Sequence, residues 1–472
     1  MEIGDFVKLE RAAGEVRYIG PVEGHKDEWI GVDWFQGGRG KHDGSVKGVR
    51  LPTSGSFVRA QNLKTGTDIL SEILEKYAIG SENVQPTHKI GVKSVETFCD
   101  DAASKQKQIE LLYAIVLDYG RVCRAPSDPS AVVFRHCQEL NLYGNLLSKW
   151  SNLLDILEAF PGLRLLNLGM NFFIHDKDFG LDPRIVKAPV EHLVLNKCHL
   201  TESMIQVFLR AFLAVSELHL QETGLTGFDI DISALGNIET LSLEGNALDS
   251  FKNLASLSSM EKLTKLNLAG CGISSIEFGD FIGFPKLHTL CLSGNPILNW
   301  SSITELSKLP SLETLTIDHL PNNDSRETLI AKLPKMKNLN HSLITAVERR
   351  NAEITFLNGF GREPVLDEHR IDIDRLKKIY GNPEEKVADQ GGMKLLNLKL
   401  TFKGKCVERS FPRNTSIQKL IGVSSRLLRF LPSRVTVEAV DPDGGRTEVN
   451  SQLDRDLSFY GIEDGFTCVF TR

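Results

Sequence analysis

The clearest pattern along the chain is a recurring phrase of apolar and polar positions in its middle part. From Cys137 onward the phrase has the form apolar-x-x-Leu-x-Leu-x-x-Asn/Cys-x-Leu, with a degraded last copy. Side chains alternate along a strand, so the two leucines of each copy point to the same side. The eight copies begin 23 to 27 residues apart, at Cys137, Leu163, Val190, Val215, Ile238, Leu263, Leu287 and Leu312.

This phrase resembles the leucine-rich repeat, and it predicts one short strand per copy, stacked into a curved solenoid. The polar residue after each strand can turn inward and satisfy backbone groups at the exit of the strand. We expect a structural role for these residues and no reactive role for the two cysteines among them. The expected turn residues are Asn171, Cys198, Asn246, Cys271 and Asn295.

The middle residue of each Leu-x-Leu segment should face outward on the concave side of the solenoid. These residues are small or medium and uncharged, which suits a broad contact with a protein better than a catalytic pocket. A plainly solvated face is the alternative interpretation. The candidate contact positions are Asn141, Asn167, Val194, His219, Ser242, Asn267, Cys291 and Thr316.

The pattern changes on both sides of the repeats and indicates a multidomain α+β chain. Residues 131–360 are predicted to form the solenoid with a helical C-terminal cap. Residues 68–130 are read as a helical connector, and residues 361–393 as a charged linker. In residues 394–472, alternating segments flank a helical segment in a ββαββ order that resembles the ubiquitin fold, a β-grasp domain. The sequence ends at Arg472 without a Gly-Gly tail, so we expect a docking domain that is not conjugated.

Residues 1–67 alternate as short strands around the glycine-rich stretch GRGKHDGSVKGVR. A P-loop is excluded because His42 follows Lys41 where the motif needs a hydroxyl residue for magnesium. A dinucleotide fingerprint is excluded because strands and turns follow the glycines instead of a helix. The segments GDFVKLE, DEWIGVDW, GKHDGSVKG and GSFVRAQNL resemble the CAP-Gly domain, a small β-rich module.

CAP-Gly domains bind the acidic C-terminal tail of α-tubulin, which ends in glutamates and an aromatic residue. Between Arg39 and Arg59 there are five basic residues and one acidic residue, a local excess that suits such a peptide. Trp29 could equally be a core residue, and Leu51-Pro52 replaces the Tyr-Phe that is common in the family. The resemblance implies tail contacts for Trp29, Lys41, His42, Phe57, Arg59 and Asn62, and a groove-shaping role for Gly40, Asp43, Gly44, Gly48 and Gly55.

Composition and charge argue against several other functional classes of protein. The chain has 472 residues and a net charge of −6, which argues against a nucleic-acid footprint over the whole chain. No signal peptide or membrane-spanning run is apparent, and the eight cysteines form no CxxC pair, so we expect a cytosolic protein with reduced thiols. We also expect no metal site, no cofactor and no enzymatic activity, since neither a Cys–His pair nor a paired carboxylate site is apparent.

The order CAP-Gly, leucine-rich repeats, ubiquitin-like domain resembles the tubulin-folding cofactor E family. This implies a cytoplasmic, cytoskeleton-associated chaperone that holds α-tubulin and assembles or dissociates the αβ-tubulin heterodimer with cofactors B, D, A and C. The ubiquitin-like domain would dock cofactor B or the proteasome. An adaptor at microtubule ends, linking microtubules to other proteins or to the ubiquitin-proteasome system, is the alternative function.

Overall fold

The structure is a computed structural model. It describes residues 1–22, 28–35, 55–78, 109–128, 132–174, 179, 182, 184–231, 235–278, 283–297, 299–318, 326–383, 395–432, 435–449 and 452–471, with the backbone of 45–46 and 49–50. The chain folds as two compact units. One comprises Met1–Asp324 with Lys335–Leu343, and the other comprises Ser325–Pro334 with Ile344–Arg472.

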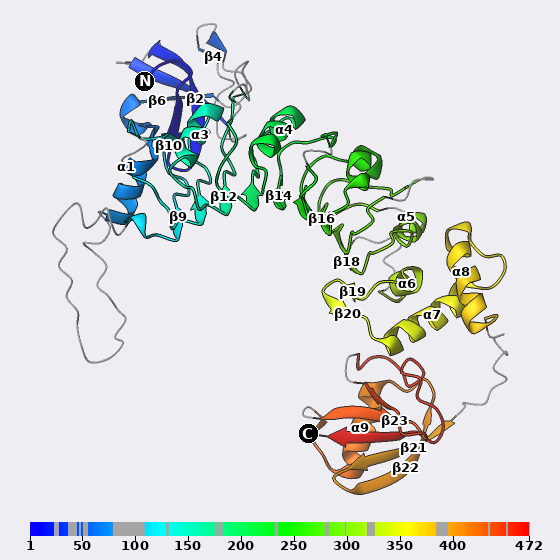
Figure 1. Cartoon of the computed structure of the whole chain (residues 1–472). Helices are drawn as coiled ribbons and strands as arrows, with labels where there is room; N and C mark the ends of the chain where they lie inside the picture. The colour runs from blue at the N-terminus through cyan, green and yellow to red at the C-terminus, as the bar shows by residue number, and fades with distance from the viewer. Residues whose placement is uncertain are drawn as a thin grey trace, which may run out of the picture. The chain divides into compact units, whose positions relative to one another are not determined.

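An antiparallel sheet in the order β6-β3-β2-β1-β7 begins the first unit (Figure 1). Alternation along its strands buries one face, where Val7, Val16, Ile30, Val32 and Trp34 form a small core. The elements are β1 (Phe6–Leu9), β2 (Ala12–Pro21), β3 (Glu28–Trp34), β6 (Gly55–Val58), the 3-10 turn η1 (Ala60–Asn62) and β7 (Lys64–Thr65). A separate hairpin joins β4 (Ser45–Val46) to β5 (Val49–Arg50).

The repeats build a parallel sheet in the order β9, β11 to β19, closed by β20, which is antiparallel to β19. The first leucine of each copy is aligned across the sheet and fully buried, as for Leu140, Leu193 and Leu290. The strands are β9 (Ala114–Val116), β11 (Glu139–Asn141), β12 (Leu165–Asn167), β13 (His192–Val194), β14 (Glu217–His219), β15 (Thr240–Ser242), β16 (Lys265–Asn267), β17 (Thr289–Cys291), β18 (Thr314–Thr316), β19 (Asn338–Leu339) and β20 (Ser342–Leu343).

Helices return the chain between strands on the other side of this sheet (Figure 1). They begin at polar caps where the sequence offers one. Thr201, Ser250 and Asn299 each accept a backbone N–H from the first turn. These elements are α3 (Trp150–Leu157), α4 (Glu202–Ala211), the 3-10 helix η5 (Phe251–Ser259) and α5 (Trp300–Leu306).

The solenoid sheet begins earlier than the repeat phrase. Its first strand, β9, lies inside the segment 68–130 that the sequence pattern assigns to a connector. The turn after β9 has no inward Asn or Cys of its own. Asn145 of the next repeat accepts from Val122 N at 2.9 Å and donates to Leu117 O at 2.8 Å, as Asn171 does with Leu147 N and Leu142 O one repeat later. The remaining elements of this segment are β8 (Thr67–Asp68), α1 (Ile69–Ile73), η2 (Leu74–Ala78) and β10 (Val122–Arg124).

The structural role predicted for Asn171, Cys198, Asn246, Cys271 and Asn295 is confirmed. Asn246 donates to Leu220 O and Leu243 O at 2.8 and 2.7 Å, and its carbonyl oxygen accepts from Leu225 N at 3.0 Å. Cys198 donates from its thiol to Leu168 O at 3.2 Å. Burial raises the pKa of the Cys198 thiol to about 12 and that of Cys271 to about 11, so both remain protonated donors.

Replacing Asn246 with Ala is expected to destabilise the first unit by about 3 kcal/mol, because buried backbone groups then lose their partners. All four tryptophans lie within Met1–Asp324, so urea unfolding followed by tryptophan fluorescence reports on this unit. Asn237→Ala is the matched control, since Asn237 is exposed and its two hydrogen bonds, to Leu213 O and from Lys262 Nζ, lie at the surface. Equal losses in the two variants would contradict the role of the buried amide.

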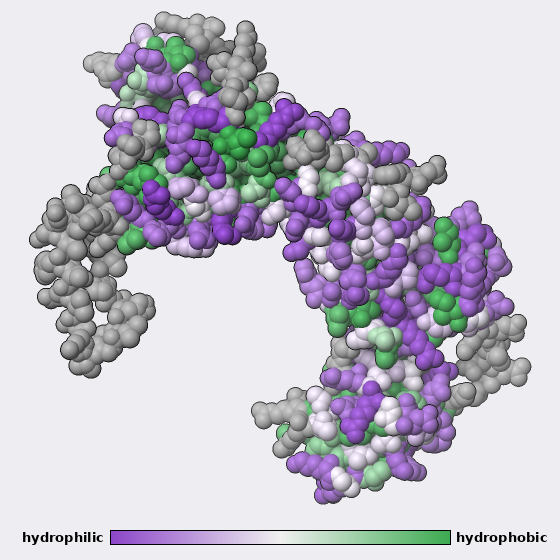
Figure 2. All heavy atoms as spheres, viewed as in Figure 1, coloured by the Kyte–Doolittle hydropathy of each residue, from purple (hydrophilic) through white to green (hydrophobic). Residues whose placement is uncertain are grey.

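Three helices of the second unit pack around a buried ion pair. They are α6 (Arg326–Lys332), α7 (Ala346–Phe360) and α8 (Asp367–Tyr380), and α8 lies in the segment 361–393 that the sequence pattern assigns to a linker. Lys332 Nζ donates to Asp372 Oδ2 at 2.9 Å and to Glu368 O at 2.7 Å. Helix α8 also exposes Ile371 and Ile379 to solvent. Figure 2 shows hydrophobic colour over this helix.

The ubiquitin-like domain forms a sheet in the order β22-β21-β25-β23-β24 with α9 (Ile417–Leu428) packed on it. The order along the chain is ββαβββ, one strand more than expected, because the PDGG turn joins two paired strands. Ser416 caps α9 by accepting from Lys419 N. The strands are β21 (Leu395–Phe402), β22 (Lys405–Pro412), β23 (Thr436–Val440), β24 (Arg446–Glu448) and β25 (Thr467–Thr471).

Candidate functional site

The face of the first sheet opposite its core carries an aromatic patch, which we define as Tyr18, Trp29, Phe57 and Arg59. Tyr18 and Phe57 lie on either side of Gly31 in the strand register, and their rings meet edge to face with centroids 5.8 Å apart. The guanidinium carbon of Arg59 lies 4.3 Å from the centroid of the Trp29 ring, a cation–π contact. All four side chains are half-buried.

Strand alternation decides which tryptophan belongs to this patch. In β3, Ile30, Val32 and Trp34 point into the core, so Trp29 points to the opposite face. Gly20 stands across from Trp29 and leaves room for Tyr18, because a Cβ at Gly20 would lie 2.6 Å from the Tyr18 hydroxyl. That hydroxyl donates to Pro21 O at 2.9 Å and holds the ring in place.

The structure brings together three of the residues predicted to contact the tail, Trp29, Phe57 and Arg59. Asn62 is exposed in η1, and Gly55 is buried at the start of β6. Tyr18 was missed by the sequence analysis. Its signal was its outward position in GEVRYIG, but the bulge between Val16 and Tyr18 shifts the alternation there. Lys41, His42, Gly40, Asp43, Gly44 and Gly48 lie outside the described residues.

The patch offers flat apolar rings beside a fixed positive charge. Such a surface can hold an aromatic or aliphatic side chain against the rings while Arg59 pairs with a carboxylate. Within the described ranges, no cluster of three His, Cys, Asp or Glu side chains could hold a metal ion. Of the helices that the structure describes, none is long and apolar enough to cross a membrane. The rings and the guanidinium give the patch an apolar surface with a positive charge beside it.

The predicted concave positions fall into one column, because the strands pair without register shifts from β11 to β18. Several of these side chains also form hydrogen bonds with the backbone of the solenoid. The side-chain oxygens of Asn141, Asn167 and Asn267 accept the backbone N–H two residues further on, at 2.9 to 3.0 Å. This strand face is mostly hydrophilic or neutral in Figure 2. The column contains Asn141, Asn167, Val194, His219, Ser242, Asn267, Cys291 and Thr316.

A carboxylate bridges two histidines near the centre of the strand face. Glu217 contacts His219 Nε2 at 2.7 Å and His192 Nδ1 at 2.9 Å. Burial raises the pKa of Glu217, but the hydrogen bonds and charges of the two histidines outweigh it and hold the pKa below its usual value. Glu244 accepts from Gln221 and Asn267, both at 3.0 Å. The centre of this face is thus a hydrogen-bonded polar surface.

Known proteins match this chain along its full length. Residues 3–63 match the family model of the CAP-Gly domain. The chain is 31% identical over 519 residues to tubulin-specific chaperone E of Rattus norvegicus, covering 100% of this chain and 98% of the relative. It is 29% identical over 469 residues to tubulin-folding cofactor E of Arabidopsis thaliana, covering 90% of this chain and 85% of the relative.

A solved structure resembles part of this chain. This is the solution structure of the C-terminal ubiquitin-like domain of mouse tubulin-specific chaperone E, at 25% identity. The match covers 18% of this chain and 91% of that chain, with a TM-score of 0.16. The family assignment rests on the relatives that match along the full length. By that similarity, this chain belongs to the tubulin-specific chaperone E family.

Proposed function

We propose that this chain is a tubulin-folding chaperone that captures α-tubulin at two places. The aromatic patch, with Lys41 and His42 of the glycine-rich stretch, binds the acidic, aromatic-terminated tail, and the strand face of the solenoid binds the folded body. The observation that carries this proposal is the cation–π contact of Arg59 and Trp29 beside the Phe57 ring. It puts a carboxylate partner and an apolar surface side by side.

The full-length similarity to relatives named tubulin-specific chaperones supports this function over that of a general adaptor. Two contacts on one partner make the second contact intramolecular, which raises the effective concentration of the second site. The chaperone would act in the cytoplasm on the αβ-tubulin heterodimer, assembling or dissociating it with cofactors B, D, A and C.

The role of the ubiquitin-like domain is docking of cofactor B or of the proteasome. The outer side of its sheet carries polar pairs, such as Lys399 with Glu408 at 3.6 Å and Arg446 with Glu438 at 3.2 Å. A partner that uses this side of the sheet would therefore be recognised mainly by polar contacts.

The test mixes the purified full chain with αβ-tubulin and identifies the subunit that is retained. We expect α-tubulin to be retained, and we expect the retention to fall when the last residues of its tail have been removed. Retention of β-tubulin alone, or equal retention without the tail, would overturn the proposal. Loss of polymer after adding the chain supports the chaperone, whereas co-sedimentation with intact microtubules would indicate the adaptor function.

A further inference from the structure

The polypeptide passes from the first sheet into the solenoid without a free connecting segment. Strand β7 ends at Thr65 and β8 begins at Thr67, where it pairs in parallel with β10 of the solenoid. Thr67 N donates to Arg121 O at 2.8 Å. The connecting residue, Gly66, is packed so closely that a Cβ there would lie 2.5 Å from Cys123 Sγ. A hinge at this point would have to break these contacts.

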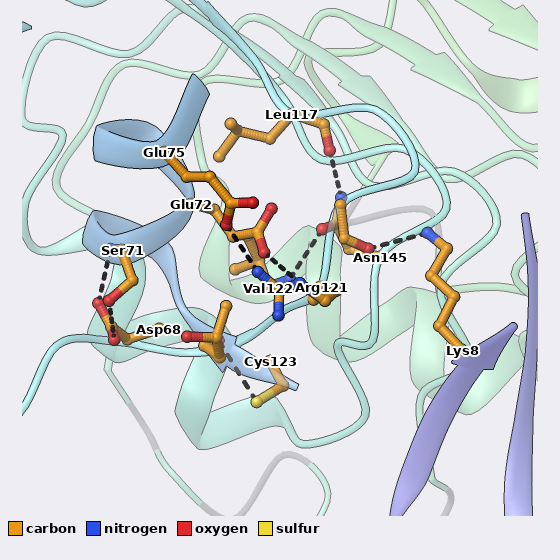
Figure 3. Close-up of polar contacts among 12 residues, drawn as sticks. Lys8, Asp68, Ser71, Glu72, Glu75, Leu117, Arg121, Val122, Cys123 and Asn145 are labelled. Atoms are coloured by element: carbon orange, nitrogen blue, oxygen red, sulfur yellow. Dashed lines mark hydrogen bonds and ion pairs between the residues drawn. The ribbon is translucent and has the colours of Figure 1, made fainter. Parts of the chain in front are cut away.

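Helix α1 is fastened to the same turn of the solenoid (Figure 3). Asp68 caps the helix by accepting from Ser71 N at 3.0 Å. Arg121 then forms two ion pairs with this segment, to Glu72 of α1 at 2.8 Å and to Glu75 of η2 at 2.7 Å. The chain on both sides of Thr67 is therefore bound to the first repeat.

Lys8 forms the deepest contact between the sheet and the solenoid. Its side chain extends from β1 toward the turn that contains Asn145 (Figure 3). Its Nζ donates to Gly120 O and to Gly144 O, both at 2.8 Å, in the turns that follow β9 and β11. The residue is 2% exposed, and burial lowers its pKa to about 8. Hydrogen bonds from a charged group are worth about twice those between neutral groups.

A chain of aromatic rings extends this contact along the solenoid. Phe6 packs against Phe35 at 4.7 Å, and Phe35 stacks on Phe172 at 4.1 Å between centroids. Phe172 in turn stacks on His199 at 5.7 Å. Because Phe172 and His199 follow β12 and β13, the contact of the sheet spans the first repeats from β9 to β13.

We call the contacts of Lys8 and of the Phe6–Phe35 pair with the solenoid the joint. The joint and the aromatic patch lie on the same face of the first sheet. Val7 belongs to the core of the sheet, so Phe6 and Lys8 point to the opposite face by alternation along β1. Tyr18, Trp29 and Phe57 lie on that same face, further along the register at β2, β3 and β6. A change in the joint would therefore move the patch relative to the strand face of the solenoid.

We propose that the first sheet and the first repeats are a single rigid body locked by Lys8 and the Phe35–Phe172 stack. This lock holds the tail-binding patch and the strand face at a fixed mutual position, so that one acidic-tailed partner is captured at both. The two-point part of the inference rests on the proposed function. Lys8 and Phe172 are positioning residues, since neither is part of the aromatic patch.

The lock is tested first by amide hydrogen exchange on the full chain. In Lys8→Met and, separately, Phe172→Ala, we expect exchange in the turns 117–120 and 142–145 to rise by about tenfold or more. Arg17→Met is the control, because Arg17 is an exposed cation of the same sheet. Unchanged exchange in both variants would overturn the lock. Two variants are used because Phe172 is a solenoid residue whose removal leaves the buried core of the first sheet intact.

The consequence for capture is tested with two ligands. The first is a synthetic peptide of the α-tubulin tail, which we expect both variants to bind as the unmodified chain does, within about twofold. The second is intact αβ-tubulin, for which we expect capture to weaken by about tenfold or more, since a loosened joint lowers the effective concentration of the second site.

The peptide and tubulin experiments distinguish a failure of the proposed function from a failure of the rigid coupling. If the unmodified chain does not bind the peptide, the proposed function fails and with it the two-point capture. If the peptide binds and exchange rises but tubulin capture is unchanged, only the coupling inference is overturned.

Discussion

Replacing Arg59 with Glu is expected to weaken binding of the α-tubulin tail peptide by about 100-fold. A hydrogen bond to a charged group contributes about 1.5 to 3 kcal/mol, and each 1.4 kcal/mol is a tenfold change in affinity. The substitution also places a carboxylate against the acidic peptide and removes the cation that lies 4.3 Å from the Trp29 ring. Titration of a labelled peptide, followed by fluorescence anisotropy, measures the change.

Arg17→Glu is the matched control for this prediction. It makes the same change in charge in the same sheet, but Arg17 is exposed and pairs with Glu15 at 2.8 Å. Because Arg17 is paired with Glu15 and is not part of the patch, we expect at most a few-fold effect from the control. If the two variants weakened binding equally, net charge would account for recognition and the patch would have no specific role.

Lys332→Met is expected to destabilise the three helices of the second unit by about 3 to 5 kcal/mol. The substitution leaves the Asp372 carboxylate, whose side chain is 3% exposed, without its closest cation. Arg375, at 3.7 Å from Asp372, is a more distant second cation and does not replace the lost hydrogen bond. Hydrogen exchange over α6 to α8 measures the loss, while tryptophan fluorescence checks that the first unit is unchanged.

The control for this prediction is Lys399→Met. Lys399 pairs with Glu408 on an exposed surface of the same unit, and such pairs contribute about 0 to 1 kcal/mol. The double variant Lys332→Met/Asp372→Leu tests the cause, because removing both charges avoids a buried carboxylate without its cation. We expect it to recover much of the lost stability. If it were less stable than Lys332→Met alone, the isolated-charge explanation would be wrong.

Arg59 and Lys332 are expected to affect different properties of the protein. Arg59 acts at the surface, so its substitution should alter binding and leave unfolding unchanged. Lys332 acts in a small core together with Phe356 and Ile373, so its substitution should alter unfolding whether or not a partner is present. A change in both properties from either substitution would show that the assignment to surface or core is wrong.

Repetition made the solenoid predictable from the sequence. The positions of Leu140 or Asn246 follow from spacing alone, because the same local solution is used in each repeat and every copy adds to the signal. Strand β9 was not predicted, because the repeat phrase is not apparent in its segment. Its turn is completed by Asn145, which belongs to the next repeat and is separated from Leu117 by 28 residues.

The resemblance to the CAP-Gly domain indicated Trp29, Phe57 and Arg59, and alternation along β3 places Trp29 on the face opposite the core residue Trp34. The patch gained Tyr18 only in the structure, since a bulge in β2 shifts the alternation at that point. Helix α8 was taken for a linker because its surface is strongly charged. The buried partner that holds it, Lys332, lies 40 residues from Asp372 in the sequence.

The sequence by itself determined the kinds of domain and their order, because these depend on residue types at short, regular spacings. The tail-binding candidates came from the resemblance to the CAP-Gly domain. Tertiary structure alone decided how the first sheet is joined to the solenoid. Lys8 reads in the sequence as an ordinary surface cation of a strand, and its two acceptors, Gly120 O and Gly144 O, lie 112 and 136 residues away. No local pattern encodes such a contact, since it exists only where two separately formed surfaces exclude water from the same charge.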